Sequence, residues 1–252
     1  MELCEGGDLV QRILDKGNYT ERDAAAIIRS VLQVVAYAHD MGVVHRDIKP
    51  DNILLKVESD VTSLQLADWG FGTFVTPGEQ LHRLCGTSYY MPPEMIDGKY
   101  DERADVWSCG VMLYVLLAGQ PPFYAVCDDA VMRKVKNDGI PNLTCNPWPF
   151  ISDDAKEAVM RMMTYDPAHR PSAREMLNHP WIREDGVAYD NVIQPEVLQR
   201  LRGFAAMTEF RRHASLVSAC GGGGEGEGHH GEACLCVSAR PARVARAGTS
   251  CR

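Results

Sequence analysis

The stretch "HRDIKPDN", residues 45–52, limits what this chain can fold into more than any other part of the sequence. It places three basic side chains, two acids and an asparagine in eight positions. The apolar run "MGVV" precedes it and "ILL" follows it, and runs of this kind predict short buried strands. Charges this dense between two strand-like segments need a chemical reason.

The side chains of this stretch suit work on a phosphoryl group. Asp47, on a loop, can accept a proton from a hydroxyl, and Lys49 can neutralise charge on a phosphoryl group that is being transferred. Asn52 offers an amide oxygen, a hard ligand for Mg²⁺, and Asp68 ends the next strand-like run, "LQLA", where it can bind the same ion. A base, a lysine and two oxygen ligands are what phosphoryl transfer requires.

Further motifs follow in a fixed order. "HRDIKPDN" resembles the catalytic loop of eukaryotic protein kinases, and "DWG" stands where that family has Asp-Phe-Gly. "GTSYYMPPE" resembles the family's substrate-docking segment, with Pro92 in place of an alanine, and "DVWSCGVMLY" its central buried helix. The resemblance covers residues 1–182. It implies a mainly α (α+β) fold, the large lobe of a protein kinase with a small β-ribbon near the catalytic loop, and with the small β lobe missing.

The resemblance implies a role for each site residue. Asp47 is the expected catalytic base, Lys49 contacts the γ-phosphate, and Thr87 braces both, as in the Ser/Thr-selective branch. Asn52 and Asp68 hold Mg²⁺, so ATP and Mg²⁺ are the expected cofactors.

The adenine side of the site is implied in the same way. The opening "MELCEGGDL" resembles the hinge, where Glu2 and Cys4 present backbone groups to adenine. Leu54 forms the floor beneath the base. Asp8 aligns with an acid that contacts ribose or a basic residue of the substrate.

Other residues have structural roles by the same resemblance. We expect Glu94 and Arg170 to form a buried ion pair, and Asp105 to accept backbone hydrogen bonds from the catalytic loop. Trp69, bulkier than the family's phenylalanine, is expected to pack against His45.

Arg46 implies that the order of residues 68–94, here called the activation segment, depends on neutralising its guanidinium. Phosphorylation of Thr73, Thr76 or Thr87 can supply the negative charge, and Glu79 can supply part of it without phosphorylation.

The pattern of apolar residues predicts the secondary structure around these motifs. Thr20 and Asp23 form a capping-box pattern ahead of a helix over about 20–40, which Gly42 follows. Further helices are predicted at 105–118, about 127–137, 153–163 and 173–178. Short strand-like runs are "VVH", "NILLKV" and "LQLA".

Residues 183–218 are predicted to form a linker and an amphipathic helix. Over 196–213, Leu198, Leu201, Phe204 (or Ala205) and Met207 recur at helical spacing among arginines. The kinase-like part most resembles calcium-dependent protein kinases that carry a calmodulin-like tail, and this helix resembles their junction segment. A calmodulin-like regulator is therefore an expected partner of residues 196–213, the alternative being a plain surface helix. Residues 219–252 are glycine-rich and of low complexity, and we expect them to be disordered.

Composition narrows the partners and the location. A formal net charge of −8 argues against nucleic acid and fits protein substrates with basic residues near the target Ser or Thr. Nine cysteines without framework spacing indicate reduced thiols, in the cytoplasm or the nucleus. The longest apolar stretch, 110–119, is half the length of a membrane span.

The resemblance starts at the hinge, so the glycine-rich loop, the third-strand lysine and its glutamate partner are expected to be missing. The expected function is that of a Ser/Thr protein kinase fragment that is inactive, or nearly so, on its own. The alternative is a non-catalytic kinase-like interaction module. Small-molecule phosphotransferases share the Asp and Asn of the loop but are not expected to carry "GTSYYMPPE", and we set them aside.

Overall fold

The computed structural model describes residues 4, 6–57, 60 and 62–220. The chain divides into one compact unit that ends at Met207 and a second that starts at Thr208. In the second unit the described residues continue a helix to Cys220. Glu2 and residues 221–252, most of the tail expected to be disordered, lie outside the described residues. No helix among the described residues is both long enough and apolar enough to cross a membrane.

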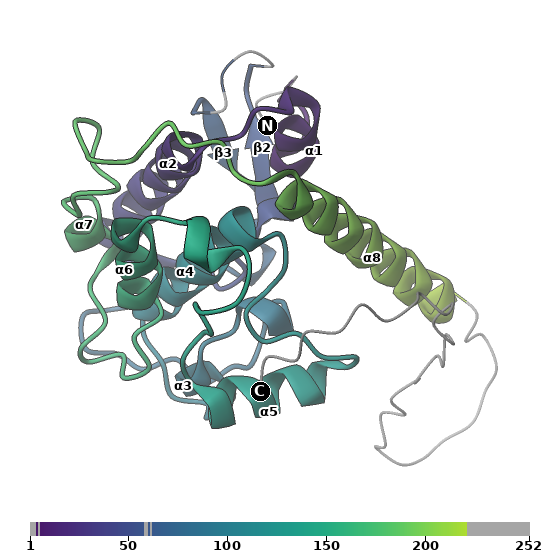
Figure 1. The fold of residues 1–252 in the computed structure, drawn as a ribbon. Helices are drawn as coiled ribbons and strands as arrows, with labels where there is room; N and C mark the ends of the chain where they lie inside the picture. The colour runs from purple at the N-terminus through teal and green to yellow at the C-terminus, as the bar shows by residue number, and fades with distance from the viewer. Residues whose placement is uncertain (1–3, 5, 58–59, 61, 221–252) are drawn as a thin grey trace. The chain divides into compact units, whose positions relative to one another are not determined.

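About half of the first unit is helical and its strands are few and short (Figure 1), which fits the mainly α prediction. Its helices are α1 (Leu9–Lys16), α2 (Glu21–Asp40), α3 (Pro93–Ile96), α4 (Arg103–Ala118), α5 (Asp128–Asp138), α6 (Asp153–Met162), α7 (Ala173–Met176) and the start of α8 (Pro195–Cys220). Short 3₁₀ turns lie at Pro50–Asn52, Trp69–Phe71, Ser88–Tyr90 and Trp148–Phe150.

Among the described residues, four short strands form two antiparallel pairs next to the catalytic loop. β1 (Val43–Val44) pairs with β4 (Thr73–Phe74), and β2 (Ile53–Leu55) pairs with β3 (Leu64–Leu66). The loop "HRDIKPDN" runs from β1 to β2, so both of its ends are fixed by a strand. The predicted small β-ribbon is therefore confirmed.

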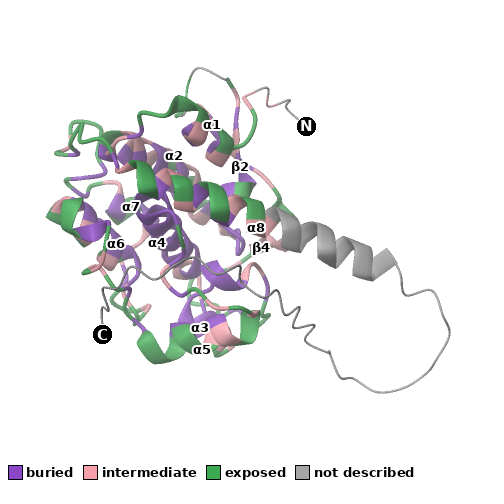
Figure 2. Ribbon diagram, turned by 45° about the vertical axis from the view of Figure 1, so that its right-hand side comes forward, coloured by how far each residue is buried: buried purple, intermediate pink, exposed green. Residues whose placement is uncertain are grey.

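α4 is the centre of the core. From Ala104 to Ala118 every one of its side chains is buried, and α2 and α6 pack against it. Figure 2 shows this helix buried among helices whose outer sides are exposed. An apolar sequence on all sides, as in "GVMLYVLLAG", is typical of a helix enclosed by its neighbours.

α2 begins where its sequence predicts. The Thr20 hydroxyl accepts a hydrogen bond from the Asp23 amide at 3.2 Å, and the Asp23 carboxylate accepts one from the Thr20 amide at 3.0 Å. Val31, Leu32 and Val35 then face the core. This packing positions the end of α2, from which the chain turns into β1 and the catalytic loop.

One buried histidine is expected to make the stability of the fold depend on pH. His179, after α7, accepts a hydrogen bond at Nδ1 from the Trp181 amide at 3.2 Å, so this nitrogen carries no proton. Burial lowers the pKa of His179 below its ordinary value of 6.5, and the charge of Arg161 adds to this, against the opposing effect of Glu157.

The unfolded chain therefore binds a proton at a higher pH than the folded chain does. We expect full stability above about pH 6.5 and a loss as the pH falls below it, with Tm lower by about 2–4 °C at pH 5.5 than at 7.5. Thermal unfolding of the wild type and of His179→Asn measures this. The side-chain oxygen of asparagine stands where Nδ1 stands in histidine, so it can still accept the Trp181 hydrogen bond but does not titrate, and its profile should be flatter. Equal slopes for the two proteins would contradict the assignment.

Candidate active site

The centre of the site is the carboxylate of Asp47, which is only 3% exposed. One of its oxygens accepts hydrogen bonds from the Thr87 amide at 2.9 Å and the Thr87 hydroxyl at 2.7 Å. The other accepts from Lys49 Nζ at 2.8 Å and from Asn52 Nδ2 at 3.2 Å. Lys49 Nζ also donates to Thr87 Oγ1 at 2.8 Å. The structure thus brings together the four residues predicted from "HRDIKPDN" and "GTSYYMPPE".

The docking segment packs closely against the catalytic loop because residue 86 is a glycine. Gly86 has φ +95°, and a Cβ on it would stand 2.3 Å from the carbonyl oxygen of Arg46. A side chain at position 86 would therefore push the docking segment off the catalytic loop. This close packing places Thr87 against Asp47 and Lys49.

The predicted metal ligands lie at the open end of the hairpin that β2 and β3 form, Asn52 just before β2 and Asp68 just after β3. The Ala67 amide donates a hydrogen bond to the Asn52 carbonyl at 2.8 Å. This bond places Asp68, the residue after Ala67, next to Asn52. Asn52 Nδ2 also donates to the Asp47 carbonyl at 2.8 Å, which leaves the side-chain oxygen of Asn52 as the atom for a cation. The Asp68 carboxylate is exposed and accepts from the Gly70 amide at 3.3 Å. Both are hard oxygen ligands, so their chemistry fits Mg²⁺.

Trp69 packs where it was predicted to pack. Its ring meets His45 edge-on, with centroids 4.6 Å apart. Its indole N–H donates to the Leu66 carbonyl at 3.0 Å, a bond that a phenylalanine cannot make. Asp68 itself has a left-handed backbone, φ 57° and ψ 67°. The indole therefore secures the turn that carries the exposed carboxylate.

Three of the residues predicted to contact adenine or ribose lie close to the β2–β3 hairpin. Asp8 forms a backbone bridge with Leu54 on β2, and the Leu55 amide donates to Gly7 O at 3.0 Å. Cys4 Sγ donates to Gln65 Oε1, on the neighbouring strand, at 3.1 Å. Cys4, Asp8 and Leu54 thus gather around the β2–β3 hairpin, and Glu2 lies outside the described residues.

The carboxylate of Asp8 has a role that the sequence interpretation missed. It accepts a hydrogen bond from the Gln11 amide at 2.8 Å and so caps α1, a helix that was not predicted. A capping acid three residues before a hydrogen-bonded amide is a recognisable signal.

Asp105 holds the catalytic loop by accepting hydrogen bonds from its backbone. It is fully buried and accepts from the amides of His45 and Arg46, each at 2.8 Å, as predicted, and it also contacts His39 Nε2 at 2.9 Å. Burial alone would raise the pKa of Asp105, but the hydrogen bond and the attraction of His39, with the two amide donors, hold it below its usual value. The residue is therefore a charged anchor for the loop.

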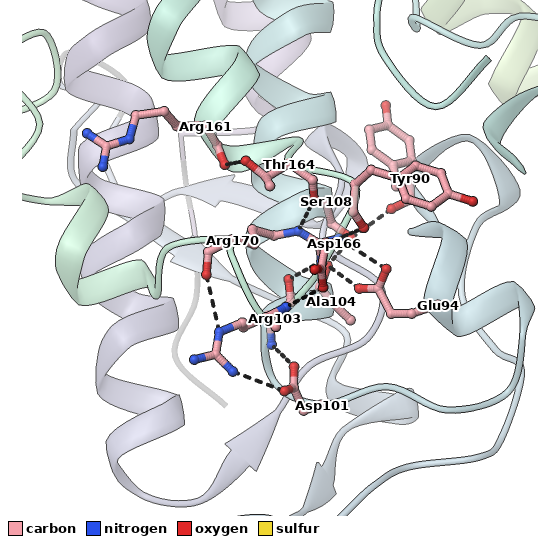
Figure 3. A network of polar contacts seen from close by, with 12 residues as sticks. Tyr90, Glu94, Asp101, Arg103, Ala104, Ser108, Arg161, Thr164, Asp166 and Arg170 are labelled. Atoms are coloured by element: carbon pink, nitrogen blue, oxygen red, sulfur yellow. Dashed lines mark hydrogen bonds and ion pairs between the residues drawn. The ribbon is translucent and has the colours of Figure 1, made fainter.

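The docking segment is fixed at its far end by the predicted ion pair (Figure 3). Arg170 donates to the two carboxylate oxygens of Glu94 at 2.5 and 3.0 Å, and both residues are buried. Ser108 Oγ, on α4, donates to the Tyr90 carbonyl at 2.8 Å. These contacts tie the segment that carries Thr87 to the core.

One prediction about the activation segment is wrong. Glu79 does not meet Arg46: its carboxylate accepts hydrogen bonds from the Thr76 amide at 3.0 Å and the Thr76 hydroxyl at 2.7 Å. A local turn thus satisfies Glu79 within three residues. Sequence proximity favours this partner over a guanidinium on another loop.

The fold and this arrangement define the class as a helical domain whose site suits phosphoryl transfer, and comparison with known proteins agrees. A model of the protein kinase domain matches residues 1–182. Calcium-dependent protein kinase 34 of Arabidopsis thaliana is 43% identical over 219 residues, which cover 87% of this chain and 42% of that protein. Calcium-dependent protein kinase 15 of Oryza sativa subsp. japonica is 45% identical over 219 residues, which cover 87% of this chain and 40% of that protein. The chain belongs to the protein kinase family, and it spans about two fifths of the length of these curated relatives.

Proposed function

We propose that this chain carries the catalytic residues of a Ser/Thr protein kinase that transfers the γ-phosphate of ATP to protein hydroxyls. The observation that carries the proposal is the bonding of Asp47, whose carboxylate is held by Thr87, Lys49 and Asn52 at once. A buried carboxylate with fixed donors is preorganised to accept the proton of a substrate hydroxyl.

The other residues follow from this geometry. Lys49, between Asp47 and Thr87, is placed to meet negative charge that develops on a transferred phosphoryl group. Asn52 and Asp68 would hold Mg²⁺, which when bound supplies positive charge to the phosphates. Cys4, Asp8 and Leu54 are the described residues proposed to contact the nucleoside of ATP, and Asp8 does so while it caps α1.

We further propose that these 252 residues alone transfer little or no phosphate. They hold no counterpart of the glycine-rich loop and strand lysine that close over ATP in this family, and phosphoryl transfer depends on such positioning. The test joins the small lobe of a calcium-dependent relative ahead of Glu2 and compares this chimaera with the chain alone. Label from [γ-³²P]ATP should reach a basic serine peptide only with the chimaera. A chimaera that folds and transfers nothing would favour the non-catalytic interaction module.

The described start of α8 supports a regulatory role for residues 196–213. Val197, Leu201 and Phe204 are buried against the domain. Leu198 and Met207 pack beside them, as predicted for two members of the stripe. A Cβ on Gly119, at the end of α4, would stand 2.3 Å from the Val197 carbonyl, so only glycine allows this approach.

The contact reaches the docking segment. The Phe204 ring meets Tyr89 edge-on, with centroids 5.7 Å apart, and the Tyr124 hydroxyl donates to Met207 Sδ at 3.1 Å. Val197, Leu201 and Phe204 are spaced i, i+4 and i+7, the pattern that a calmodulin-like partner grips. The same apolar face cannot serve both partners, so a calmodulin-like regulator would have to lift the helix from the domain. We propose calcium control of this kind.

Phe204→Ala tests the regulatory contact. In the chimaera we expect about fivefold or greater basal phosphate transfer, because loss of the ring weakens the docking of α8 beside Tyr89. Arg202→Ala, an exposed position on the same helix, is the matched control and should leave basal transfer unchanged. Equal rates for the two variants would count against autoinhibition by this helix.

A further inference from the structure

The guanidinium of Arg46 poses a problem that the proposed function leaves open. Arg46 is only 8% exposed, and a buried cation is costly unless other groups compensate its charge. Among the residues that the structure describes, no carboxylate lies within 4.0 Å of it. Its bonds go instead to two neutral oxygens: Nε donates to the Phe71 carbonyl at 2.7 Å and Nη1 to the Tyr100 hydroxyl at 3.2 Å.

Tyr100 is the residue that closes this network. It lies between α3 and α4 and is 2% exposed. Its hydroxyl accepts the bond from Arg46 and donates to the Arg83 carbonyl at 2.6 Å. Its backbone exchanges two hydrogen bonds with Leu81, at 2.8 and 3.1 Å. The side chain of Tyr100 thus joins the catalytic loop to the activation segment at Arg83. The backbone of Tyr100 holds the same segment at Leu81, two residues before Arg83.

Neighbouring contacts hold the same stretch. His82 Nδ1 lies 2.7 Å from the Gly98 carbonyl, just before Tyr100. Leu81, Met91, Met95 and Tyr100 belong to a small cluster of buried apolar residues that is separate from the main core. The activation segment from Leu81 to Cys85 is therefore fixed on residues 98–100.

We propose that Tyr100 is a positioning residue that holds the activation segment on Arg46 by neutral hydrogen bonds, so that no phosphorylated side chain is needed to order it. The hydrogen bonds from Arg46 to the Tyr100 hydroxyl and from that hydroxyl to the Arg83 carbonyl take the place of the ionic partner that a buried guanidinium would otherwise require. This inference rests on the proposed function only in giving the activation segment a role in phosphate transfer. The order of the segment itself can be tested without measuring phosphate transfer.

Arg83 supplies the reporter. Its carbonyl is the acceptor of the Tyr100 hydroxyl, and its side chain is exposed, so trypsin can cleave after it once the segment opens. The experiment uses the whole chain, treated with phosphatase, and follows cleavage after Arg83 by mass spectrometry. We expect Tyr100→Phe, which keeps the ring and the backbone bonds, to raise the rate of this cleavage about five- to tenfold.

Tyr114→Phe is the matched control. The Tyr114 hydroxyl also accepts from an N–H, Trp148 Nε1 at 3.3 Å, and donates to a carbonyl, Asn142 at 3.1 Å, but it lies within the helical core. A general loss of stability would affect both variants, whereas only Tyr100→Phe should raise cleavage after Arg83. The proposal would be overturned if Tyr100→Phe were cleaved after Arg83 at the wild-type rate, or if the cleavage rate rose equally in both variants.

Hydrogen exchange of the wild type is a second test, which still applies if the Tyr100→Phe variant does not fold. In the unphosphorylated wild type, the amides of Leu81 and Tyr100 donate to each other's carbonyls and should resist hydrogen exchange at least 100-fold relative to a free peptide. Exchange of these two amides at the free rate would show that the segment is not ordered without phosphate, and the proposal would fail.

Discussion

Replacing Arg170 by methionine should lower the free energy of unfolding by about 3–5 kcal/mol, the largest stability effect expected for a single change in this chain. Arg170 is 2% exposed, and the variant leaves the Glu94 carboxylate buried without its partner. Three carbonyls would lose a donor as well, because the guanidinium also bonds to Arg103, Thr164 and Tyr165. It lies 5.0 Å above the Trp107 ring, and this contact is lost too. Urea unfolding followed by circular dichroism measures the change.

Two control variants separate the buried pair from charge in general. Arg161 also lies in this region, but its side chain is 54% exposed and its ion pair with Glu157 is 3.9 Å long, so Arg161→Met should change stability by no more than about 0.5 kcal/mol. The double variant Glu94→Leu with Arg170→Met removes the orphaned charge and should be more stable than Arg170→Met alone. An Arg170→Met protein within about 1 kcal/mol of the wild type would refute the structural role of the pair.

The catalytic loop could be predicted from sequence because its parts are few and local. Asp47, Lys49 and Asn52 lie within six positions, and the strand on either side fixes their directions. Asp68 joins them because β2 and β3 form a hairpin, which a pair of short apolar runs indicates. The same holds for α2, whose cap is specified by Thr20 and Asp23 alone.

What the sequence did not reveal depends on contacts between distant segments. Tyr100 meets Arg46 only because residues 81 and 100 pair, and no local pattern encodes that pairing. The contact of His39 with Asp105 likewise spans 66 positions. Interpretation by resemblance assigned Arg46 an ionic partner, and this led to the wrong role for Glu79.

The missed helix α1 has a different cause. Asp8 and Gln11 form a capping signal, but the resemblance implied only a contact of Asp8 with ribose or with a basic residue of the substrate. A side chain can do both, because a cap uses only part of a carboxylate's hydrogen-bonding capacity. Helix ends also shifted: α4 begins at Arg103 instead of 105, and α7 ends at Met176 instead of 178.

The largest functional effect is expected for Asp47→Asn. Asparagine keeps the size of the side chain and can still accept a hydrogen bond from the Thr87 amide, but it cannot take up the proton of a substrate hydroxyl. It also removes the negative charge that Lys49 faces at 2.8 Å. In the chimaera we expect kcat to fall by about 10²- to 10⁴-fold. Asp51→Asn is the matched control. Asp51 is an exposed acid of the same loop, and we propose that it faces a basic substrate residue, so its loss should raise KM for the peptide and leave kcat unchanged.

The central claim is that Asp47 is the base of a phosphoryl-transfer site built by Thr87, Lys49, Asn52 and Asp68. The most direct measurement is the rate at which the chimaera and its Asp47→Asn variant transfer ³²P from [γ-³²P]ATP to a basic serine peptide at saturating Mg²⁺. We predict steady transfer by the parent and transfer at least about 100-fold slower by the variant, with both proteins unfolding at similar temperatures. A folded variant that transfers phosphate at the parent's rate would contradict the account.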